Sequence, residues 1–218
     1  MKIIKHIYSK IRRSLLPTPH ERVVNKWFKD RGDARLRIDY PLTADSLVMD
    51  VGGFRGDWAY AIHAKYQCKV HVFEPHPRAF ATLKARFAKH VDIVLHDFGL
   101  SASDRWLPIS DEGRASSVFH NEGSSLEIEL KSIASWMKAN NIRSVDLLKA
   151  NIEGGEYELF EDMIANSLIP RFRYIQIQFH TVDDNSCARR KLIRSTLSKT
   201  HRLQWDYPMV WESWEKMN

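Results

Sequence analysis

Acidic residues and glycines follow two apolar runs of this sequence in a pattern that could hold a nucleoside. The first run, Leu47-Val48-Met49, ends at Asp50, and a turn with the spacing Asp50-x-Gly52-x-x-x-Gly56 follows it. Glycine has no Cβ, so the backbone of such a turn can approach a ligand closely. A second apolar run, residues 69–73, ends at Glu74. An acid about 20 residues after a glycine turn in a βαβ unit binds ribose hydroxyls.

The acid at position 50 distinguishes this turn from a dinucleotide-binding loop. Such a loop has the spacing G-x-G-x-x-G, and the sequence here does not match it. A carboxylate at the end of the strand would repel a pyrophosphate, but it suits a cationic amino-acid ligand such as S-adenosylmethionine. Together with Glu74, the turn therefore favours a nucleoside-containing cofactor.

Three further polar sites follow predicted strands. They are Asp97, the segment 151–153 and His180. In open α/β sheets, ligands bind outside the carboxyl ends of the strands. We therefore expect these three sites to converge with Asp50 and Glu74 on one rim of a sheet.

The elements that would position these residues alternate along the chain. Apolar or alternating runs predict strands, and apolar residues at helical spacing predict helices between them. Strands that alternate with helices imply parallel βαβ units. The predicted fold class is α/β, a doubly wound, mostly parallel sheet whose antiparallel edge comes from two strands about Pro208. The predicted strands are 47–51, 69–73, 91–95, 126–130, 145–152 and 174–179; the predicted helices are 58–66, 77–87, 156–165, 187–199 and one that Ser132 caps; residues 98–119 are expected to be irregular or to form short strands.

Composition describes an ordinary globular protein. The 218 residues suit one domain with a full core. The 33 Lys and Arg exceed the 27 Asp and Glu, giving a net charge of +6. Cys68 and Cys187 are the only cysteines, and they have no metal-ligand or disulfide spacing, which favours a reducing cytoplasm. No apolar run reaches the roughly 18 residues of a membrane span, and the first residues lack the continuous apolar segment of a secretion signal.

The first residues form a separate pattern. Residues 2–16 place Ile, Leu and Tyr at helical spacing among five Lys and Arg, without an acid. Such a helix either packs on the domain or a partner, or lies on an anionic membrane surface. Residues 20–31 repeat the helical pattern, and Gly32 is a plausible stop. We therefore expect a helical extension over residues 1–32 and one domain over residues 33–218.

Several motifs resemble the FkbM-type methyltransferases. The resemblance covers roughly residues 45–182, and the block from Lys149 to Glu156 is the most specific part of it. It implies a Rossmann-like class I fold with S-adenosylmethionine as cofactor. Asn151 departs from the family, which usually has Asp there, so a role that needs this charge is weakened or has moved. The matching blocks are Asp50–Asp57, Val72–Pro75, Gly99–Ser101 with Asp104, Asp146–Gly154 with Glu156, and Gln178–His180; the implied cofactor residues are Asp50, Gly52, Gly53, Phe54, Arg55, Gly56, Glu74, Pro75 and Asp97.

Methyl transfer to a hydroxyl then defines the catalytic candidates. The acceptor oxygen must be held close to the sulfonium methyl, and a hydroxyl needs a base or a metal at neutral pH. His180 is the first candidate base and Glu153 the second. Lys149 could stabilise the developing alkoxide or pair with Glu153 or Glu156. Asn151 completes the candidate set.

Structural alternatives stay open for the same residues. His180 could be a hydrogen-bonded residue at a strand end, and the two glutamates could cap the helix that follows Gly154. No resident metal is expected, although Asn151, Glu153 and His180 could hold a divalent cation or zinc.

The motifs and the resemblance together predict a cytoplasmic O-methyltransferase, and the resemblance implies a saccharide hydroxyl as acceptor. A cell-surface or lipid-linked glycan is the expected acceptor, and residues 1–16 provide a possible peripheral contact with the inner membrane surface. One alternative is a binding module that kept the fold and lost the reaction, which Asn151 alone supports. A nucleic-acid methyltransferase is the weaker alternative, because the basic cluster is remote from the cofactor motifs and the Asn-Pro-Pro-Tyr signature is absent. No nucleic-acid partner is expected, and no oligomeric state is predicted.

Overall fold

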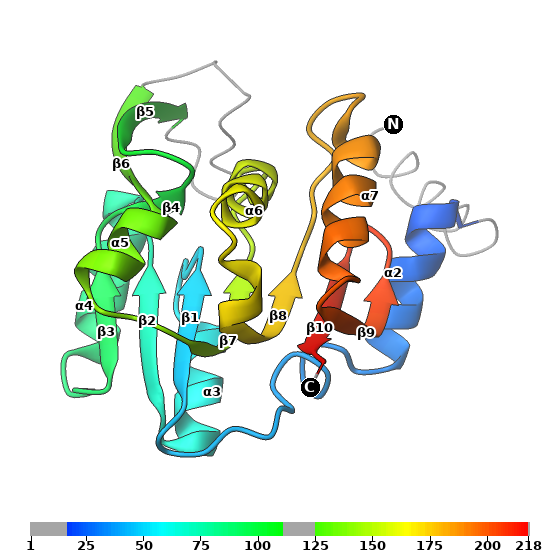
Figure 1. Cartoon of the computed structure of the whole chain (residues 1–218). Coiled ribbons are helices and arrows are strands. Elements are labelled where there is room, and N and C mark those ends of the chain that lie inside the picture. Colours follow the sequence, from blue (N-terminus) through cyan, green and yellow to red (C-terminus); the bar gives the residue numbers. More distant parts are fainter. Residues whose placement is uncertain (1–16, 111–124, 218) are drawn as a thin grey trace, which may run out of the picture.

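A seven-stranded sheet forms the centre of the computed structural model, which describes residues 17–110 and 125–217. Its strand order is β3-β2-β1-β7-β8-β10-β9 (Figure 1). The first five strands in this order are parallel, and β10 is antiparallel to both of its neighbours. The predicted α/β class, with an antiparallel C-terminal edge, is therefore confirmed. The strands are β1 (Leu47–Val51), β2 (Lys69–Phe73), β3 (Ile93–His96), β7 (Val145–Ala150), β8 (Phe172–Ile177), β9 (His201–Tyr207) and β10 (Trp211–Lys216).

Three strand boundaries differ from the prediction. β7 ends at Ala150, because the last residue of its partner β1, Val51, lies opposite it. Asn151 and Ile152 are therefore loop residues. β8 begins and ends two residues earlier than the alternation of 174–179 indicated. β3 begins at Ile93, and the β-prone Val91 is 90% exposed.

Two helical layers cover the sheet, because successive side chains of each strand point to opposite faces. Val48 and Leu147 pack under the helices α3 and α4 on one face. Met49 and Leu148 pack under the helices α5, α6 and α7 on the other. These helices are α3 (Asp57–Tyr66), α4 (Pro77–Phe87), α5 (Ile133–Ala139), α6 (Glu156–Ala165) and α7 (Ser186–Leu197), and a 3-10 helix η1 (Ile169–Arg171) precedes β8.

A second, three-stranded sheet lies beyond the carboxyl ends of β1 to β3, at the upper left of Figure 1. It consists of β4 (Gly99–Ser101), β6 (Ser125–Ser132) and β5 (Arg105–Ser110), in the order β4-β6-β5. Residues 126–130 are a strand as predicted, but in this sheet and not in the main one. Ser101 and Arg105 both bond the Glu158 carboxylate of α6, which ties the small sheet to the main domain.

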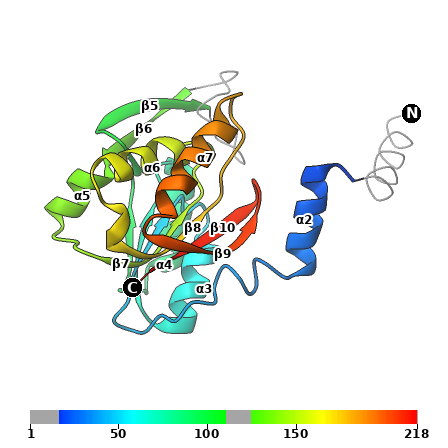
Figure 2. The same cartoon turned by 45° about the vertical axis from the view of Figure 1, so that its right-hand side comes forward.

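The helix α2 (Pro19–Lys29) packs beside the β9 edge (Figure 2). Thr18 and Glu21 form a capping box at its start, and the ring of Trp27, which is 2% exposed, contacts the ring of Tyr207 at 4.9 Å. The predicted helix over 20–31 is thus present within slightly different bounds. The helix expected over 2–16 lies outside the described residues, and the division at residue 32 stays a prediction. No helix within the described ranges is long and apolar enough to cross a membrane.

Candidate active site

All five polar sites that the sequence places at strand ends lie on one edge of the main sheet. Asp50 is the penultimate residue of β1, Glu74 follows β2 and Asp97 follows β3. The segment 151–153 follows β7, and His180 lies three residues beyond β8. Because these five strands are parallel, their carboxyl ends share an edge. β7 lies between β1 and β8 in the sheet, so His180 follows a strand that does not pair with the strand of Asp50.

The glycine turn after β1 packs closely on the loop after β7. Gly52 has a φ of +87°, and a Cβ built on it would lie 2.0 Å from the carbonyl oxygen of Asn151. Only glycine fits both the left-handed backbone and this contact. Phe54 also has a positive φ, of 47°, and its ring is partly exposed beside the guanidinium of Arg55 at 5.2 Å. The turn is thus a strained and tightly supported segment, of the kind that is found at ligand sites.

The Glu74 carboxylate holds this turn in place. Its Oε2 accepts a hydrogen bond from the amide of Phe54 at 2.7 Å, and its Oε1 accepts one from the amide of His76 at 2.9 Å. Burial is the main influence on the pKa of Glu74 and raises it above its ordinary value. Each carboxylate oxygen has a second lone pair, so this group can also accept bonds from ribose hydroxyls. Pro75 lies beside Gly99 of β4, and Asp97 is exposed at the end of β3.

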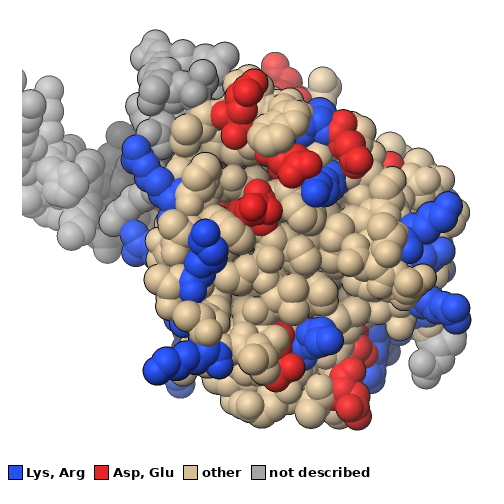
Figure 3. All heavy atoms as spheres, turned by 90° about the vertical axis from the view of Figure 1, so that its left-hand side faces the viewer, with Lys and Arg blue, Asp and Glu red and all other residues tan. Residues whose placement is uncertain are grey.

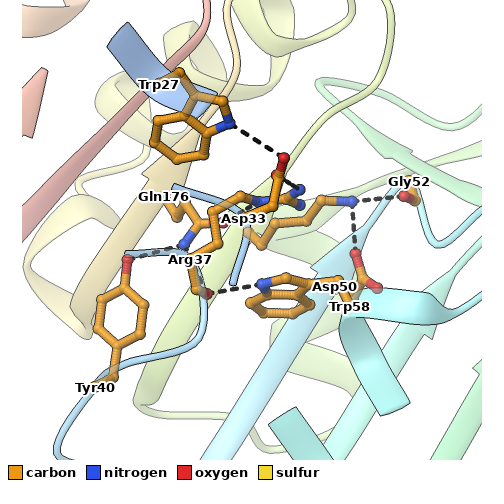
Figure 4. A network of polar contacts seen from close by, with 9 residues as sticks. Trp27, Asp33, Arg37, Tyr40, Asp50, Gly52, Trp58 and Gln176 are labelled. Atoms are coloured by element: carbon orange, nitrogen blue, oxygen red, sulfur yellow. Dashed lines mark hydrogen bonds and ion pairs between the residues drawn. The ribbon is translucent and has the colours of Figure 1, made fainter. Parts of the chain in front are cut away.

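Asp50 and Lys149 form a buried ion pair between β1 and β7 (Figure 4). Their side chains are 1% and 4% exposed, and the Lys149 Nζ lies 2.8 Å from the Asp50 Oδ1. The same ammonium donates to the carbonyl of Gly52 at 2.6 Å. Pairing with Glu153 or Glu156 is one of two roles considered for Lys149 from the sequence, and the structure pairs it with Asp50 because the sheet register places the two residues directly opposite each other. Burial is the main influence on the pKa of Lys149 and lowers it.

One carboxylate oxygen of Asp50 can accept a hydrogen bond from a ligand. The Asp50 Oδ2 is buried and has no hydrogen-bond partner within residues 17–110 and 125–217. A buried, unpartnered carboxylate oxygen is costly, so a donor is expected there. The α-ammonium of S-adenosylmethionine would be such a donor. The residues present therefore fit a cofactor with a cationic amino-acid end.

His180 is held by two glutamates of the loop and helix that follow β7. Its Nδ1 lies 3.0 Å from the Glu156 Oε1, and its Nε2 lies 3.6 Å from the Glu153 Oε2. Glu156 is fully buried and also accepts bonds from the amides of Ile152 at 2.6 Å and Gly154 at 2.8 Å. Its carboxylate thus holds the loop that precedes α6 and orients the imidazole. Sequence reasoning considered this glutamate as a cap or as a partner of Lys149, and missed its bond to His180.

The surroundings of His180 make it a stronger base than free imidazole. Burial lowers its pKa, but the hydrogen bond and the charge of Glu156, together with the charge of Glu153, outweigh this and raise it above 6.5. Because a carboxylate only accepts hydrogen bonds, the Nδ1 that faces Glu156 must carry a proton. The Nε2 of the neutral imidazole is then free of a proton and can accept one from a substrate. The Tyr157 hydroxyl donates to the carbonyl of His180 at 2.7 Å and fixes its backbone.

Asn151 lies between the two halves of the site. Its amide donates to the carbonyl of Val51 at 3.1 Å, and its Oδ1 is buried without a described partner. No group of three or more His, Cys, Asp and Glu within the described ranges could hold a metal ion.

Sequence reasoning missed two further polar residues beside the site. Gln176 of β8 lies opposite Lys149 in the register, and Arg37 donates to its side chain at 3.2 Å. The alternating polarity of β8 was the signal that could have found Gln176. Arg37 lies 139 positions away, and no local pattern marks it.

Comparisons with known proteins agree with this geometry. The family model described as the methyltransferase FkbM domain matches residues 50–205, which is more than half of the chain and spans the glycine turn, Lys149, Glu156 and His180. Comparison with curated proteins finds no match.

Two solved structures are similar to the chain. One is a chain of the fibrillarin/Nop5p complex, at 12% identity and a TM-score of 0.52, with 86% of this chain and 79% of that chain covered. The other is a putative methyltransferase from Streptococcus mutans in complex with SAH, at 10% identity and a TM-score of 0.50, with 81% and 91% covered. Such low identities show the fold alone. Fold, cofactor rim and family model together place the chain in the FkbM methyltransferase family, as an S-adenosylmethionine-dependent methyltransferase of the class I fold.

Proposed function

We propose that this enzyme transfers the methyl group of S-adenosylmethionine to a hydroxyl of a saccharide, with His180 as the general base. One observation carries the mechanism: Glu156 engages Nδ1 of His180 and leaves its Nε2 beside Glu153 at the rim. The saccharide class rests on the resemblance to the family. The cofactor supplies an electrophilic methyl group on a sulfonium. The protein must therefore increase the electron density on the acceptor oxygen of the saccharide.

Residues at the ends of different strands would bind different portions of the cofactor. Glu74 at the end of β2 would accept bonds from the ribose hydroxyls, and Asp97 at the end of β3 would lie toward the base. Asp50 at the end of β1 would accept from the α-ammonium. The turn of Gly52, Gly53, Phe54, Arg55 and Gly56, with Pro75 beside it, would line the space between them.

His180 then takes the proton of the acceptor hydroxyl on Nε2. With the cofactor bound, the acceptor oxygen would bond the methyl carbon, and the electron pair of the broken bond would stay on sulfur. Glu156 stabilises the imidazolium that forms, because it already accepts from Nδ1. Glu153, whose side chain is 44% exposed, would steer the acceptor hydroxyl. Lys149 serves the cofactor side of the rim and not the proton transfer, because its ammonium is bound to Asp50 and Gly52.

One described face of the molecule does not carry the continuous basic surface that a nucleic acid would need (Figure 3). A nucleic-acid site needs a continuous basic surface. On the face over β3, α4 and α5, Lys and Arg are scattered around a largely uncharged centre, with Asp and Glu among them (Figure 3).

Incubation with labelled S-adenosylmethionine tests the proposal. Glycan extracts from cells with and without the gene would serve as acceptors, and mass spectrometry would locate the methyl group. A methylated sugar that forms only with the natural protein is the expected result. Cofactor binding without transfer to any glycan would favour the binding module, and label in RNA would favour the nucleic-acid alternative.

A peripheral membrane contact through residues 1–16 would bring the enzyme to a lipid-linked acceptor at the inner membrane surface. The helix that follows supports this, because α2 exposes Phe28 together with the basic Arg22 and Lys29. Apolar and basic groups on one exposed helix are typical of interfacial binding. Flotation with anionic vesicles should carry the full chain, whereas a chain that starts at His20 should stay in solution. Equal behaviour of the two chains at low salt would contradict the proposal.

A further inference from the structure

A row of buried polar side chains crosses four strands of the main sheet at its rim. Asp50 of β1, Lys149 of β7, Gln176 of β8 and Ser213 of β10 are successive partners in the register. Residues at the same register position point to the same face, and all four side chains are buried. Asp50 and Lys149 belong to the cofactor side of the site. Gln176 and Ser213 therefore extend the cofactor side of the site toward β10.

The segment of residues 33–40, which we call the strap, covers this row (Figure 4). Arg37 donates from Nε to the Oε1 of Gln176 at 3.2 Å. The Tyr40 hydroxyl contacts Gln176 and Ser213, both at 2.9 Å. The carbonyl of Arg37 accepts from the indole of Trp58 at 2.9 Å, and that ring belongs to the first turn of α3. The strap thus connects β8 and β10 to the helix that follows the glycine turn.

Two cations face a single buried carboxylate here. Lys149 is bound to Asp50 and to the carbonyl of Gly52. Arg37 is held flat, because its guanidinium stacks on Trp211 at 3.9 Å, and its Nη1 donates to Asp33 at 2.9 Å. Asp33 is itself 55% exposed, so it neutralises this cation weakly. A guanidinium has five N–H donors, and its bonds to described residues use Nε and Nη1 alone.

The order of the strands shows what Arg37 could bind. Glu74 would fix the ribose at β2, and the unpartnered Oδ2 of Asp50 at β1 would accept from the α-ammonium. The amino-acid portion of the cofactor then extends away from β2, toward β7 and β8. Its α-carboxylate, which is attached to the same carbon as the ammonium, would meet the side of the row that Arg37 covers.

We infer that Arg37 of the strap binds the α-carboxylate of the methionine portion of S-adenosylmethionine. A planar guanidinium matches a carboxylate with two parallel bonds, and the low polarity around the buried row strengthens the contact. The strap precedes the residues that the family model matches, which begin at position 50. The α-carboxylate of the cofactor would thus be bound by a segment outside the residues that the family model matches.

Calorimetry with two ligands tests the inference. S-adenosylhomocysteine carries the carboxylate, and 5′-methylthioadenosine shares its nucleoside and thioether but lacks the amino acid. Arg37→Gln should weaken binding of the first by about 10- to 100-fold, the range for a lost charge-assisted hydrogen bond. Binding of the second should change by less than about twofold, because it makes no contact with residue 37. Arg35→Gln is the matched control, since it removes an exposed cation of the same strap and should leave the binding of both ligands unchanged.

A second ligand pair keeps the test independent of folding. S-adenosylhomocysteine whose carboxylate is converted to a carboxamide should bind the natural chain about 10-fold more weakly. The same conversion should have little effect in Arg37→Gln. Equal losses for both ligands in Arg37→Gln, or an unchanged affinity, would overturn the inference. If the natural chain binds 5′-methylthioadenosine and binds the carboxamide as tightly as S-adenosylhomocysteine, only the role of Arg37 is contradicted. If the natural chain binds none of these ligands, the assignment of the cofactor residues is contradicted as well.

Discussion

His180 is the proposed base at this rim, and its pKa lies above the ordinary value of 6.5 because burial lowers it less than the two glutamates raise it. As a base it must be neutral before it accepts a proton, and its raised pKa means that protonated enzyme persists above pH 6.5. Glu156 therefore has two opposing effects, because it strengthens the base and also keeps more of it protonated. This makes the pH profile a direct report on the contact between the two side chains.

We expect His180→Gln to reduce the rate of methyl transfer by about 10²–10⁴-fold, the usual contribution of a general base. Cofactor affinity should stay nearly unchanged, because His180 lies on the acceptor side. Radiometric assays and calorimetry measure the two quantities. His20→Gln is the matched control, since it changes an exposed histidine of α2. A loss of less than about threefold would leave His180 a structural residue and move the role to Glu153.

The pH dependence tests Glu156 as a positioning residue. The kcat/KM of the natural enzyme should rise with pH through a midpoint above 6.5, because the pKa of His180 is raised. Glu156→Gln keeps an acceptor for the amide of Ile152 but removes the charge, so its midpoint should move to lower pH. An unchanged midpoint would show that Glu156 only holds the loop that precedes α6.

Protonation of His180 should also stabilise the fold. A group whose pKa is raised on folding adds stability below its unfolded pKa, and this contribution is lost as the pH rises through the folded pKa. The difference in unfolding free energy between the natural protein and His180→Gln should therefore be larger at pH 5.5 than at pH 8.5. Urea unfolding at both values measures it, and an equal difference would mean that the glutamates do not act on His180.

At the scale of elements, the rim depends on contacts between β1, β7 and the loops that follow them. Gly52 is packed against Asn151, and the Asp50–Lys149 pair links the two strands below that contact. Breaking a buried ion pair leaves one charge without compensation, and this costs more than the pair itself contributes.

We expect Asp50→Asn to lower the unfolding free energy by about 3–5 kcal/mol, because Lys149 would stay buried without its counter-charge. Replacing both residues by Leu and Met should restore most of this loss. Asp39→Asn is the control, since it breaks an exposed pair with Lys65 and should cost less than about 1 kcal/mol. Urea titration measures all three. A similar small loss in Asp50→Asn and Asp39→Asn would mean that water reaches Lys149.

The same contacts explain which parts of the structure the sequence could predict. Strand ends follow from local periodicity, so Asp50, Glu74 and His180 were placed at the rim from their neighbours in the chain. The partner of Lys149 depends on register between strands 99 positions apart, which local spacing does not contain. β4, with three residues, is too short for a periodic signal, and its sheet forms only when it pairs with β6. The bond between Arg37 and Gln176 likewise exists only in the folded chain.

At the scale of the whole molecule, α2 and the β9–β10 hairpin form a unit at one edge. Trp27 packs with Tyr207 and Trp211 in a cluster separate from the two main cores. Tyr207 also donates to Asp30 at 2.5 Å. Leu36 of the strap packs against the same cluster, so the position of α2 sets the position of Arg37.

Trp27→Ala should therefore loosen α2 and the strap before it affects the sheet. Removing a buried Trp typically costs about 3–5 kcal/mol, and here the loss falls on one local cluster. Hydrogen exchange should rise in residues 19–40, while β1 and β7 stay protected. Phe28→Ala is the control, because Phe28 is 66% exposed. If the exchange of β1 rises equally, α2 and the sheet unfold as one unit.

The contacts of the strap also determine when the cofactor site can be completed during synthesis of the chain. Tyr40 and Ser213 are bonded across 173 positions, and Tyr207 and Asp30 across 177. Strands β1, β2 and β7 can pair while later residues are still inside the ribosome, because their partners have already emerged. The strap can already contact Trp58 and Gln176 before β10 is made, but Arg37 and Tyr40 gain their contacts with Trp211 and Ser213 only when β10 has been synthesised. A nascent chain would thus have Glu74 and the Asp50–Lys149 pair in place several seconds before β10 is made, at about 5–20 residues per second, and would complete the surroundings of Arg37 only with β10.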